Sequence, residues 1–187
     1  SVVDRWGNAV SNTYTLNGNY GSGVVARGTG VLMNNEMDDF ASKPGTPNLF
    51  GLVQGEKNAI APGKRMLSSM SPSLVLDPKG QLFMAVGSPG GSTIITSVFQ
   101  VISNVVDFGL PLNWAVCMPR VHHQGLPDTL QYEVGGLPSR SLDALHKMGH
   151  ATVPRERIGD VEAILRRPDG TLEAVADPRR QGEAAGH

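Results

Sequence analysis

The strongest pattern of apolar positions lies in the middle of the chain. Residues 81–86 (QLFMAV) form an almost unbroken apolar run, which is typical of a buried strand. Residues 93–107 instead repeat apolar side chains at helical spacing. The positions on this stripe are Ile94, Ile95, Val98, Ile102, Val105 and Val106. Because GSPGGS stands between the two segments at 87–92, the sequence predicts a strand, a tight glycine turn and an amphipathic helix, with Ser92 as its N-cap.

The composition of this turn suits the binding of negative charge. Pro89 fixes its own φ, while Gly90 and Gly91 lack a Cβ, so their amides can approach a ligand closely or adopt positive φ. Successive N–H groups and the positive end of the helix dipole then point at one spot, where an oxyanion or a carboxylate is stabilised. The alternative interpretation is that the glycines only permit a sharp turn.

The remaining periodicity predicts one α+β domain, residues 1–187, with no internal repeat. Strands are expected at residues 2–3, 9–16, 24–26, 30–35, 73–76, 130–134, 161–165 and 171–175. Helices are expected at 111–116 and 139–148. The first two and the last two strands flank turn residues, so we expect each pair to form a hairpin.

A long loop is expected at residues 41–65, which contain three prolines, four glycines and little periodicity. Loops of this length inside a compact domain are often lids or binding loops. Leu49 and Phe50, near its middle, are suited to cover a pocket. The alternative is an ordered surface excursion with no gating role.

Two polar segments are candidates for ligand binding. Asn34, Asn35, Glu36, Asp38 and Asp39 stand among apolar residues, so some of them are expected to face inward and to need partners such as a substrate ammonium. Acidic residues at a turn are, however, commonly just solvated. Ser68 and Ser69 precede a predicted core strand, and their adjacent hydroxyls suit a carboxylate, although serines are common at such positions.

Charge and length exclude several classes of function. The chain has 16 basic and 17 acidic residues and no large basic cluster, which argues against nucleic acid or an anionic membrane as a partner. Its apolar runs are shorter than the roughly 20 residues of a membrane span. The chain begins directly with a predicted strand, which is typical of a terminus made by proteolysis or of a sequence that begins late.

The sequence favours neither a disulfide nor a metal site. Cys117 is the only cysteine, and its apolar neighbours predict a small core residue. His122 and His123 are adjacent, so on a strand they point in opposite directions, and no third ligand follows at a useful spacing. We therefore expect no metal and no cofactor.

Five motifs occur in order along the chain and together identify a family. They read NAVSNTYTLN at 8–17, NNEMDDF at 34–40, KRMLSSMSP at 64–72, GSPGGS at 87–92 and PRVHHQ at 119–124. Over essentially its whole length the chain resembles the small subunit of γ-glutamyltransferases, also called γ-glutamyl transpeptidases. The resemblance implies an N-terminal nucleophile hydrolase, whose proenzyme cleaves itself autocatalytically. The two subunits would remain together as a heterodimer in a four-layer αββα sandwich, completed by a large subunit that is not in this chain.

The activity implied by the resemblance is γ-glutamyl acyl transfer. The donor is glutathione or another γ-glutamyl amide, and the acceptor is water, an amino acid, a peptide or an amine. The intermediate is an ester on an N-terminal threonine, whose own α-amino group acts as the base. This chain departs from the family at that point, because the threonine would precede Ser1. Ser1 itself is an alternative nucleophile.

Roles for individual residues follow from the resemblance. Thr15 corresponds to the threonine that orients the nucleophile, and Gly90 and Gly91 correspond to the oxyanion-hole amides. The expected donor ligands are Asn17, Glu36 and Asp39 for the α-ammonium, and Ser68 and Ser69 for the α-carboxylate. The lid of the family corresponds to residues 44–55, with Phe50 as its aromatic gate. Because Phe50 has no hydroxyl, it cannot latch the lid through one.

Two other functions remain open from the sequence. An acylase of the same architecture, acting on glutaryl amides or cephalosporins, would not need the ammonium ligands Glu36 and Asp39. A binding subunit without a nucleophile is the third possibility. The resemblance also implies a periplasmic or secreted protein, and it suggests that Trp6, in the first turn, packs against the large subunit.

Overall fold

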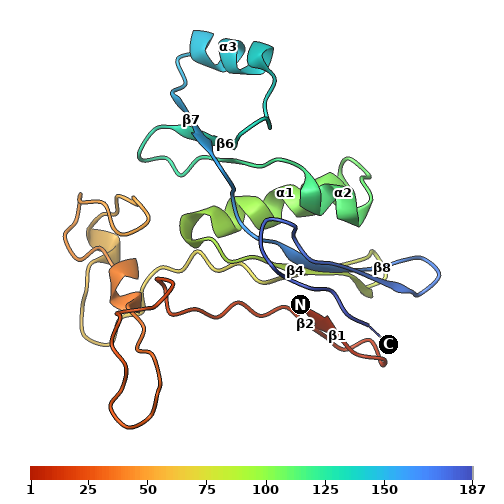
Figure 1. The fold of residues 1–187 in the computed structure, drawn as a ribbon, viewed down its shortest axis with the longest axis horizontal. Coiled ribbons are helices and arrows are strands. Elements are labelled where there is room, and N and C mark those ends of the chain that lie inside the picture. The colour runs from red at the N-terminus through yellow and green to blue at the C-terminus, as the bar shows by residue number, and fades with distance from the viewer. Residues whose placement is uncertain (187) are drawn as a thin grey trace.

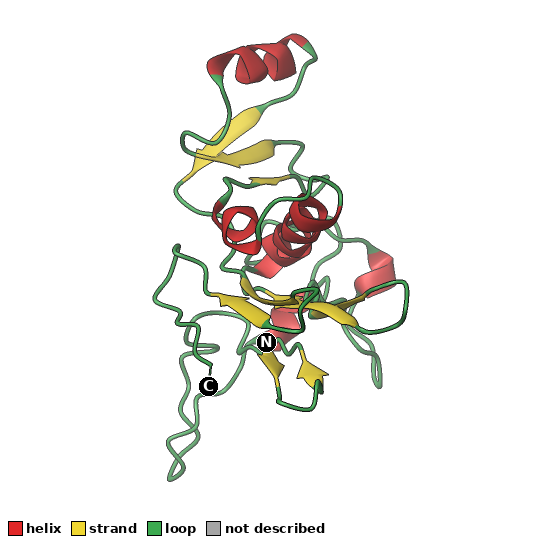
Figure 2. Cartoon of the chain, turned by 90° about the vertical axis from the view of Figure 1, so that its right-hand side faces the viewer, coloured by secondary structure: helices red, strands yellow, loops and turns green. Residues whose placement is uncertain are grey.

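The chain folds as an α+β domain, as predicted, and the computed structural model describes residues 1–186. Its centre is an antiparallel sheet in the strand order β3-β4-β8-β9, formed by Ser73–Leu76, Leu82–Gly87, Glu162–Arg166 and Leu172–Val175. Two helices, α1 (Ile94–Val106) and α2 (Leu112–Cys117), cover one face of this sheet (Figures 1 and 2). One helical layer and one sheet layer are therefore present.

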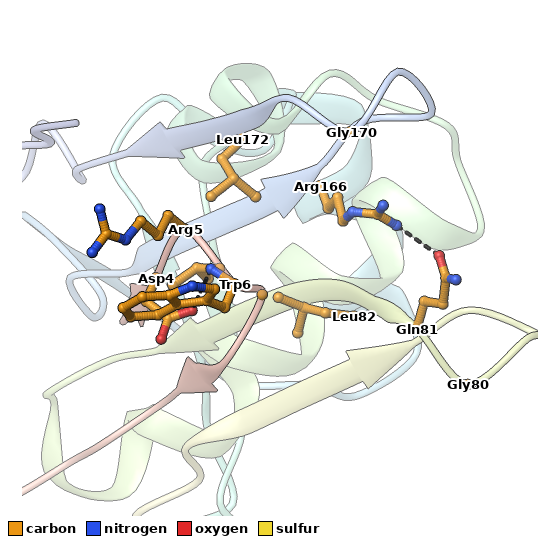
Figure 3. A pocket seen from close by; sticks show the side chains of 11 residues that line it. Asp4, Arg5, Trp6, Gly80, Gln81, Leu82, Arg166, Gly170 and Leu172 are labelled. Carbon is orange, nitrogen blue, oxygen red and sulfur yellow. Dashed lines mark hydrogen bonds between the residues drawn. The ribbon is translucent and has the colours of Figure 1, made fainter. Parts of the chain in front are cut away.

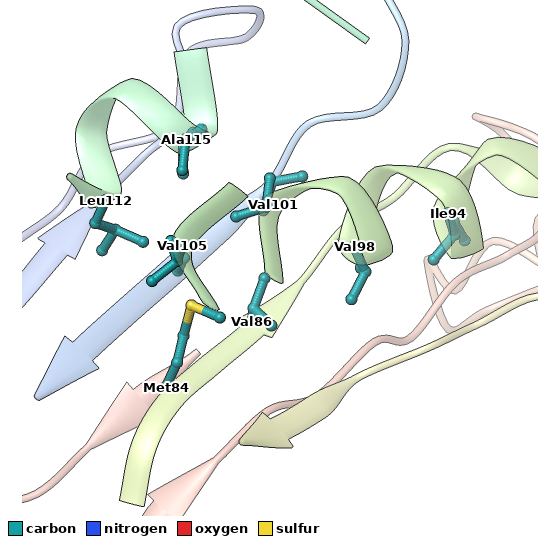
Figure 4. Packing of buried hydrophobic residues seen from close by; sticks show 11 residues of the cluster. Met84, Val86, Ile94, Val98, Val101, Val105, Leu112 and Ala115 are labelled. Atoms are coloured by element: carbon teal, nitrogen blue, oxygen red, sulfur yellow. The ribbon is translucent and has the colours of Figure 1, made fainter. Parts of the chain in front are cut away.

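The core lies between the central sheet and these two helices. It is formed by Met84, Val86, Val161 and Ala163 from the sheet side, Ile94, Val98, Val101 and Val105 from α1, and Leu112, Ala115 and Val116 from α2 (Figure 4). The buried positions of α1 repeat at intervals of four and three residues, so they lie on one face of the helix, which packs against the sheet. The predicted stripe was wrong at Ile95 and Val106, which are more than half exposed, because Val101 occupies the centre of the buried face.

A smaller module projects from the helical side. It contains a sheet of β5 (Val121–His122), β6 (Leu130–Glu133) and β7 (Thr152–Arg155), and helix α3 (Ser139–Lys147), which lies at the top of Figure 1. Strands β6 and β7 are parallel. Strands β5 and β7 were not predicted, because β5 has only two residues and β7 contains Pro154, which argues against a strand.

The first forty residues have less regular structure than predicted. Strands β1 (Val2–Val3) and β2 (Ala9–Val10) form the expected hairpin, but β2 ends at Val10 and not at residue 16. The strands predicted at 24–26 and 30–35 are reduced to a single bridge between Val25 and Leu32. Glycines with positive φ at 21, 23, 28 and 30 interrupt this segment, so no continuous ladder forms.

A buried ionic network fixes the end of the chain to the domain. The Arg120 guanidinium lies 2.7 Å from Asp177, and Arg179 lies 3.0 Å from Asp177 and 2.6 Å from Glu133. Asp177 also accepts a 2.7 Å hydrogen bond from the backbone N–H of Val161, next to β8. These partners compensate the cost of burying four charged groups.

Two further observations concern the whole chain. Cys117 is exposed, so its predicted place in the core was wrong: the last turn of α2 directs Val116 inward and Cys117 outward. Among residues 1–186, none of the helices has both the length and the apolar character that crossing a bilayer requires.

Candidate active site

The glycine turn after β4 has the backbone geometry that its sequence predicts. Gly90 and Gly91 have φ values of 141° and 57°, which non-glycine residues rarely adopt. A Cβ on Gly90 would lie 2.5 Å from Oγ1 of Thr93, which itself donates a hydrogen bond to the Gly90 carbonyl. A 3-10 turn, Gly91–Thr93, leads into α1, so Thr93 stands at the N-cap and the prediction of Ser92 for that position was wrong.

The two serines lie next to this turn. The Ser69 hydroxyl donates a 2.8 Å hydrogen bond to the carbonyl of Gly91 and so holds the turn. The Ser68 hydroxyl accepts a hydrogen bond from the Met70 N–H, which leaves its own hydrogen available for a ligand. Ser69 has to release Gly91 before it can donate to a carboxylate, whereas Ser68 does not.

A cavity of about 240 Å³ opens beside the turn. It combines carboxylate, hydroxyl, imidazole and amide groups with a few apolar side chains. The lining residues are Asp39, Leu52, Gln54, Leu67, Ser68, Ser69, Ser92, Ile95, Thr96, His122, His123 and Gln124. Three of the predicted donor ligands, Asp39, Ser68 and Ser69, are thus brought together, although they are up to 30 positions apart in the sequence.

The acidic end of the cavity is formed by a 3-10 helix, Glu36–Asp39. Burial raises the pKa of Glu36 above its ordinary value, and the neighbouring charge of Asp39 raises it further. Burial also raises the pKa of Asp39, which the charge of Asp38 reinforces and a hydrogen bond from Glu36 opposes. Two partly buried carboxyl groups side by side are suited to a cationic partner, which would restore the charged state of both.

The remaining two predicted residues adjoin this helix. The Asn17 side chain donates a 3.2 Å hydrogen bond to the carbonyl of Asn35, directly before Glu36, and Asn17 has a φ of 71°. The Thr15 hydroxyl accepts a 2.8 Å hydrogen bond from the Asn17 backbone N–H. Thr15, Asn17 and Glu36 are not among the residues that line the 240 Å³ cavity, so within residues 1–186 they support its acidic side and do not form its wall.

The lid segment, residues 44–55, is an ordered turn. The Asn48 side-chain oxygen accepts hydrogen bonds from the N–H groups of Phe50 and Leu52, each at 3.0 Å. The Leu49 N–H donates to the carboxylate of Asp38 at 3.0 Å. The Phe50 ring lies against Gly91, where a Cβ would come within 2.5 Å of the ring. The lid segment therefore reaches both the acidic helix and the glycine turn.

His122 and Gln124 belong to the site although no site role was predicted for them. His122 is 2% exposed, and its two ring nitrogens lie 2.8 Å from the Thr96 hydroxyl and 3.0 Å from Gln124 Oε1. Burial lowers the pKa of His122, so the ring is neutral near pH 7. No grouping of three His, Cys, Asp or Glu residues in the described part of the chain is arranged for a metal ion. The signal in the sequence that points to these two residues is the motif PRVHHQ, which contains them both.

A larger cavity, of about 630 Å³, lies at the other end of β4. It is bounded by the first turn and by Gln81, Leu82, Arg166 and Leu172 (Figure 3). Trp6 stands at its edge with 73% of its surface exposed and with the Arg5 guanidinium 4.4 Å from its ring centre. This cavity begins where β4 begins, whereas the glycine turn follows the end of β4, so the two are separate.

Comparison with known proteins finds relatives that match nearly the whole chain. The profile of the Gamma-glutamyltranspeptidase family matches residues 1–187. The glutathione hydrolase proenzyme of Pseudomonas aeruginosa is 53% identical over 186 residues, which cover 97% of this chain and 33% of that protein. The chain thus spans about a third of the length of this curated relative.

Solved structures agree in fold. The γ-glutamyltranspeptidase of Pseudomonas nitroreducens in complex with L-DON is 51% identical, covers 100% of this chain and 97% of that chain, and has a TM-score of 0.92. A cephalosporin acylase from Bacillus halodurans is more distant, at 29% identity and a TM-score of 0.73, with 89% of this chain and 30% of that chain covered. The helix and sheet layers described above are accordingly part of the N-terminal nucleophile hydrolase fold, and this chain belongs to the gamma-glutamyltranspeptidase family.

Proposed function

We propose that this chain is the small, catalytic subunit of a γ-glutamyltransferase that hydrolyses glutathione and other γ-glutamyl amides or transfers their γ-glutamyl group to amino acids, peptides or amines. The observation that carries the proposal is the position of Asp39, Ser68 and Ser69 around one cavity, with Ser69 hydrogen-bonded to the Gly91 carbonyl. Groups suited to an ammonium and a carboxylate therefore adjoin an oxyanion turn, which is the layout that a γ-glutamyl donor requires.

The chemistry is acyl transfer in two steps. A hydroxyl oxygen attacks the γ-carbonyl carbon, the N–H groups of Gly90 and Gly91 stabilise the resulting oxyanion, and the amine leaves with the hydroxyl proton. Water or an acceptor amine then attacks the ester, and the hydroxyl is regenerated. Asp39 binds the donor ammonium, and Glu36 and Asn17 support it from behind the cavity wall. Ser68 binds the donor carboxylate, and Ser69 joins it when its hydroxyl turns away from Gly91.

The nucleophile in this proposal is a threonine shortly before Ser1, oriented by Thr15. Two contacts support its position. The Ser1 hydroxyl donates a 3.1 Å hydrogen bond to the carbonyl of Glu162, and Glu162 pairs with Gly87 at the end of β4. Ser1 therefore lies at the end of the sheet that carries the glycine turn. A few residues of extended chain, at about 3.3 Å each, suffice to carry a preceding threonine toward Gly90 and Gly91.

The same proposal includes a large subunit, made from the same proenzyme by self-cleavage. Leu74 and Leu76 of β3 are 50% and 58% exposed and alternate with Val75, which packs on the core, so they lie on the face of the sheet away from α1. A second sheet on this face would give the four-layer sandwich, and Trp6 would join that interface. We propose a periplasmic or secreted location, which an export signal in the complete gene would support.

The test is covalent labelling of the complete protein. We expect a γ-glutamyl-mimicking electrophile to add one label to the small subunit, on a threonine that precedes Ser1, as mapped by peptide mass spectrometry. Glutathione present in excess should prevent the labelling. A label on Ser1 would identify a serine nucleophile, and the absence of any label would leave a binding protein. Faster turnover of glutaryl anilide than of γ-glutamyl anilide would instead identify an acylase.

A further inference from the structure

Phe50 lacks the hydroxyl with which an aromatic gate could hold the lid closed. Its main-chain carbonyl is instead bound by a side chain from another segment. The Gln124 side-chain N–H group donates hydrogen bonds to the carbonyl of Phe50, at 3.3 Å, and to the carbonyl of Leu126, at 3.2 Å. Phe50 is 74 positions away along the chain, so this contact joins the lid to the segment after β5. On its other side, the Phe50 ring lies against Gly91.

Gln124 is itself oriented by a buried group. Because its nitrogen donates to two carbonyls, its oxygen must face His122, whose Nε2 lies 3.0 Å away. His122 therefore carries its proton on Nε2, and its Nδ1 is an acceptor 2.8 Å from the Thr96 hydroxyl on α1, whose single hydrogen also has the Thr93 carbonyl as an acceptor at 3.1 Å. A neutral ring is consistent with burial, since His122 is only 2% exposed.

We propose that Gln124 is the latch of the lid: its carboxamide holds the Phe50 carbonyl and so keeps the Phe50 ring on the oxyanion turn and Leu52 and Gln54 over the donor cavity. Gln124 is a positioning residue and acts through Phe50. It takes the part that a hydroxyl on the gate would take, but it binds the main chain. Its kinetic consequence rests on the proposed γ-glutamyl transfer, whereas its effect on the lid does not.

Two substitutions separate the latch from simple support of His122. Gln124→Ala removes the hydrogen bonds to Phe50, Leu126 and His122 alike. Gln124→Glu keeps an acceptor for His122 Nε2 but has no N–H group for the Phe50 carbonyl, which its carboxylate repels. Gln81→Ala is the matched control, because Gln81 also makes a side-chain hydrogen bond, to Arg166 at 2.8 Å, but at the opposite end of β4.

The first readout is hydrogen–deuterium exchange of the lid peptide, residues 44–55, in the complete protein without substrate. We expect lid exchange about 3- to 10-fold faster in both Gln124 variants and unchanged in Gln81→Ala, since one hydrogen bond of ordinary strength is lost. Lid exchange equal to wild type in Gln124→Ala would overturn the latch. Fast exchange in Gln124→Ala together with wild-type exchange in Gln124→Glu would show that Gln124 only supports His122, which also overturns it.

The second readout is the kinetics with a γ-glutamyl anilide. We expect Gln124→Ala to raise KM about 3- to 10-fold and to change kcat less than twofold, because the lid covers the donor cavity and not the nucleophile. Phe50→Ala keeps the main-chain carbonyl that Gln124 binds, so in that background Gln124→Ala should still raise KM. Loss of the effect in that background would contradict a latch on the main chain of the lid. If the lid responds but wild-type protein does not turn over γ-glutamyl amides, the latch stands and the proposed function fails.

Discussion

The ring of Phe50 lies so close to the backbone of Gly91 that a Cβ at position 91 would fall 2.5 Å from the ring atoms Cδ1 and Cε1. The lid segment and the glycine turn are therefore one packed unit, although 41 positions separate these residues in the sequence. Gly91 meets two requirements at once, because its φ of 57° is unfavourable for a side chain and its missing Cβ makes room for the ring.

Gly91→Ala should lower kcat about 100-fold or more, because the substitution displaces either the Phe50 ring or an amide of the oxyanion turn. The measurement is steady-state kinetics with a γ-glutamyl anilide. Gly63→Ala is the control, since Gly63 has a similar φ of 70° and nothing within 4 Å of a Cβ. Phe50→Ala, combined with Gly91→Ala, should restore part of the lost kcat by removing the clash. No restoration would mean that backbone strain alone causes the loss.

Substitution of the two adjacent serines should have different kinetic effects. Ser69→Ala removes the hydrogen bond to the Gly91 carbonyl, so we expect kcat to fall about 3- to 10-fold in addition to any rise in KM. Ser68→Ala removes a ligand hydroxyl and the acceptor of the Met70 N–H but no contact to the glycine turn, so we expect KM to rise by a similar factor at nearly unchanged kcat. Identical changes in the two variants would contradict the separate role of Ser69.

Asp39→Ala should lower kcat/KM for a γ-glutamyl anilide by about 100-fold or more, because it leaves the donor ammonium without its partly buried carboxylate partner. The control is a change of substrate. Glutaryl anilide has no ammonium group, so its kcat/KM should change less than threefold in the same variant. Equal losses for the two anilides would show that Asp39 supports the fold and does not bind the ammonium.

Lowering the pH should weaken donor binding, and the weakening should begin at a higher pH than for carboxyl groups with ordinary pKa values. The raised pKa values of Glu36 and Asp39 mean that both carboxyl groups take up protons above their ordinary values of 4.5 and 3.8, and a neutral carboxyl no longer attracts the ammonium. As the pH is lowered, the ratio of kcat/KM for γ-glutamyl to glutaryl anilide should therefore begin to fall above the ordinary carboxyl range, and the ratio cancels titration of the nucleophile. A ratio that stays constant down to pH 4 would contradict this assignment.

The raised pKa values of Glu36 and Asp39 also predict how the stability of the ligand-free protein changes with pH. A carboxyl group with a raised folded pKa contributes stability that is complete below its unfolded pKa and is lost as the pH rises through the folded value. Glu36→Gln should therefore increase the free energy of unfolding relative to wild type at pH 7 but not at pH 3.5. Urea unfolding at the two pH values measures the difference.

The ionic network around Arg120 predicts the opposite pH dependence. Burial raises the pKa of Asp177, but the hydrogen bonds from Val161 and Arg120 outweigh this effect and keep the pKa below its ordinary value of 3.8. Its contribution to stability is therefore complete above about pH 4 and is lost as the pH falls through the lowered folded value. Asp177→Asn should lower the free energy of unfolding by about 3 kcal/mol or more at pH 7, and the difference from wild type should narrow below pH 4. Asp143→Asn, on the exposed side of α3, is the control and should change stability by less than about 0.5 kcal/mol.

Local pattern was sufficient for the elements that bury one continuous face. The strand at 82–87, the helix at 94–106 and the pairing of 162–166 with 172–175 were all predicted, because each has a clear apolar period and a turn beside it. Local pattern failed where a strand is defined by its neighbour. Val121–His122 and Thr152–Arg155 become strands only because residues 130–133 lie between them. The exposure of Cys117 depended on which face of a short helix met the sheet.

By itself the sequence determined the glycine turn and the family, and it predicted the acidic and hydroxyl ligands, because these depend on residue type and order along the chain. Only the tertiary structure decided that Phe50 packs on Gly91, that Ser69 holds the same turn and that Gln124 reaches the lid from beyond β5. Each of these contacts joins segments between 22 and 74 positions apart. No local period encodes such a contact; it forms because packing α1 on the central sheet brings the turn, the lid and the strand after α2 to the same side of one cavity.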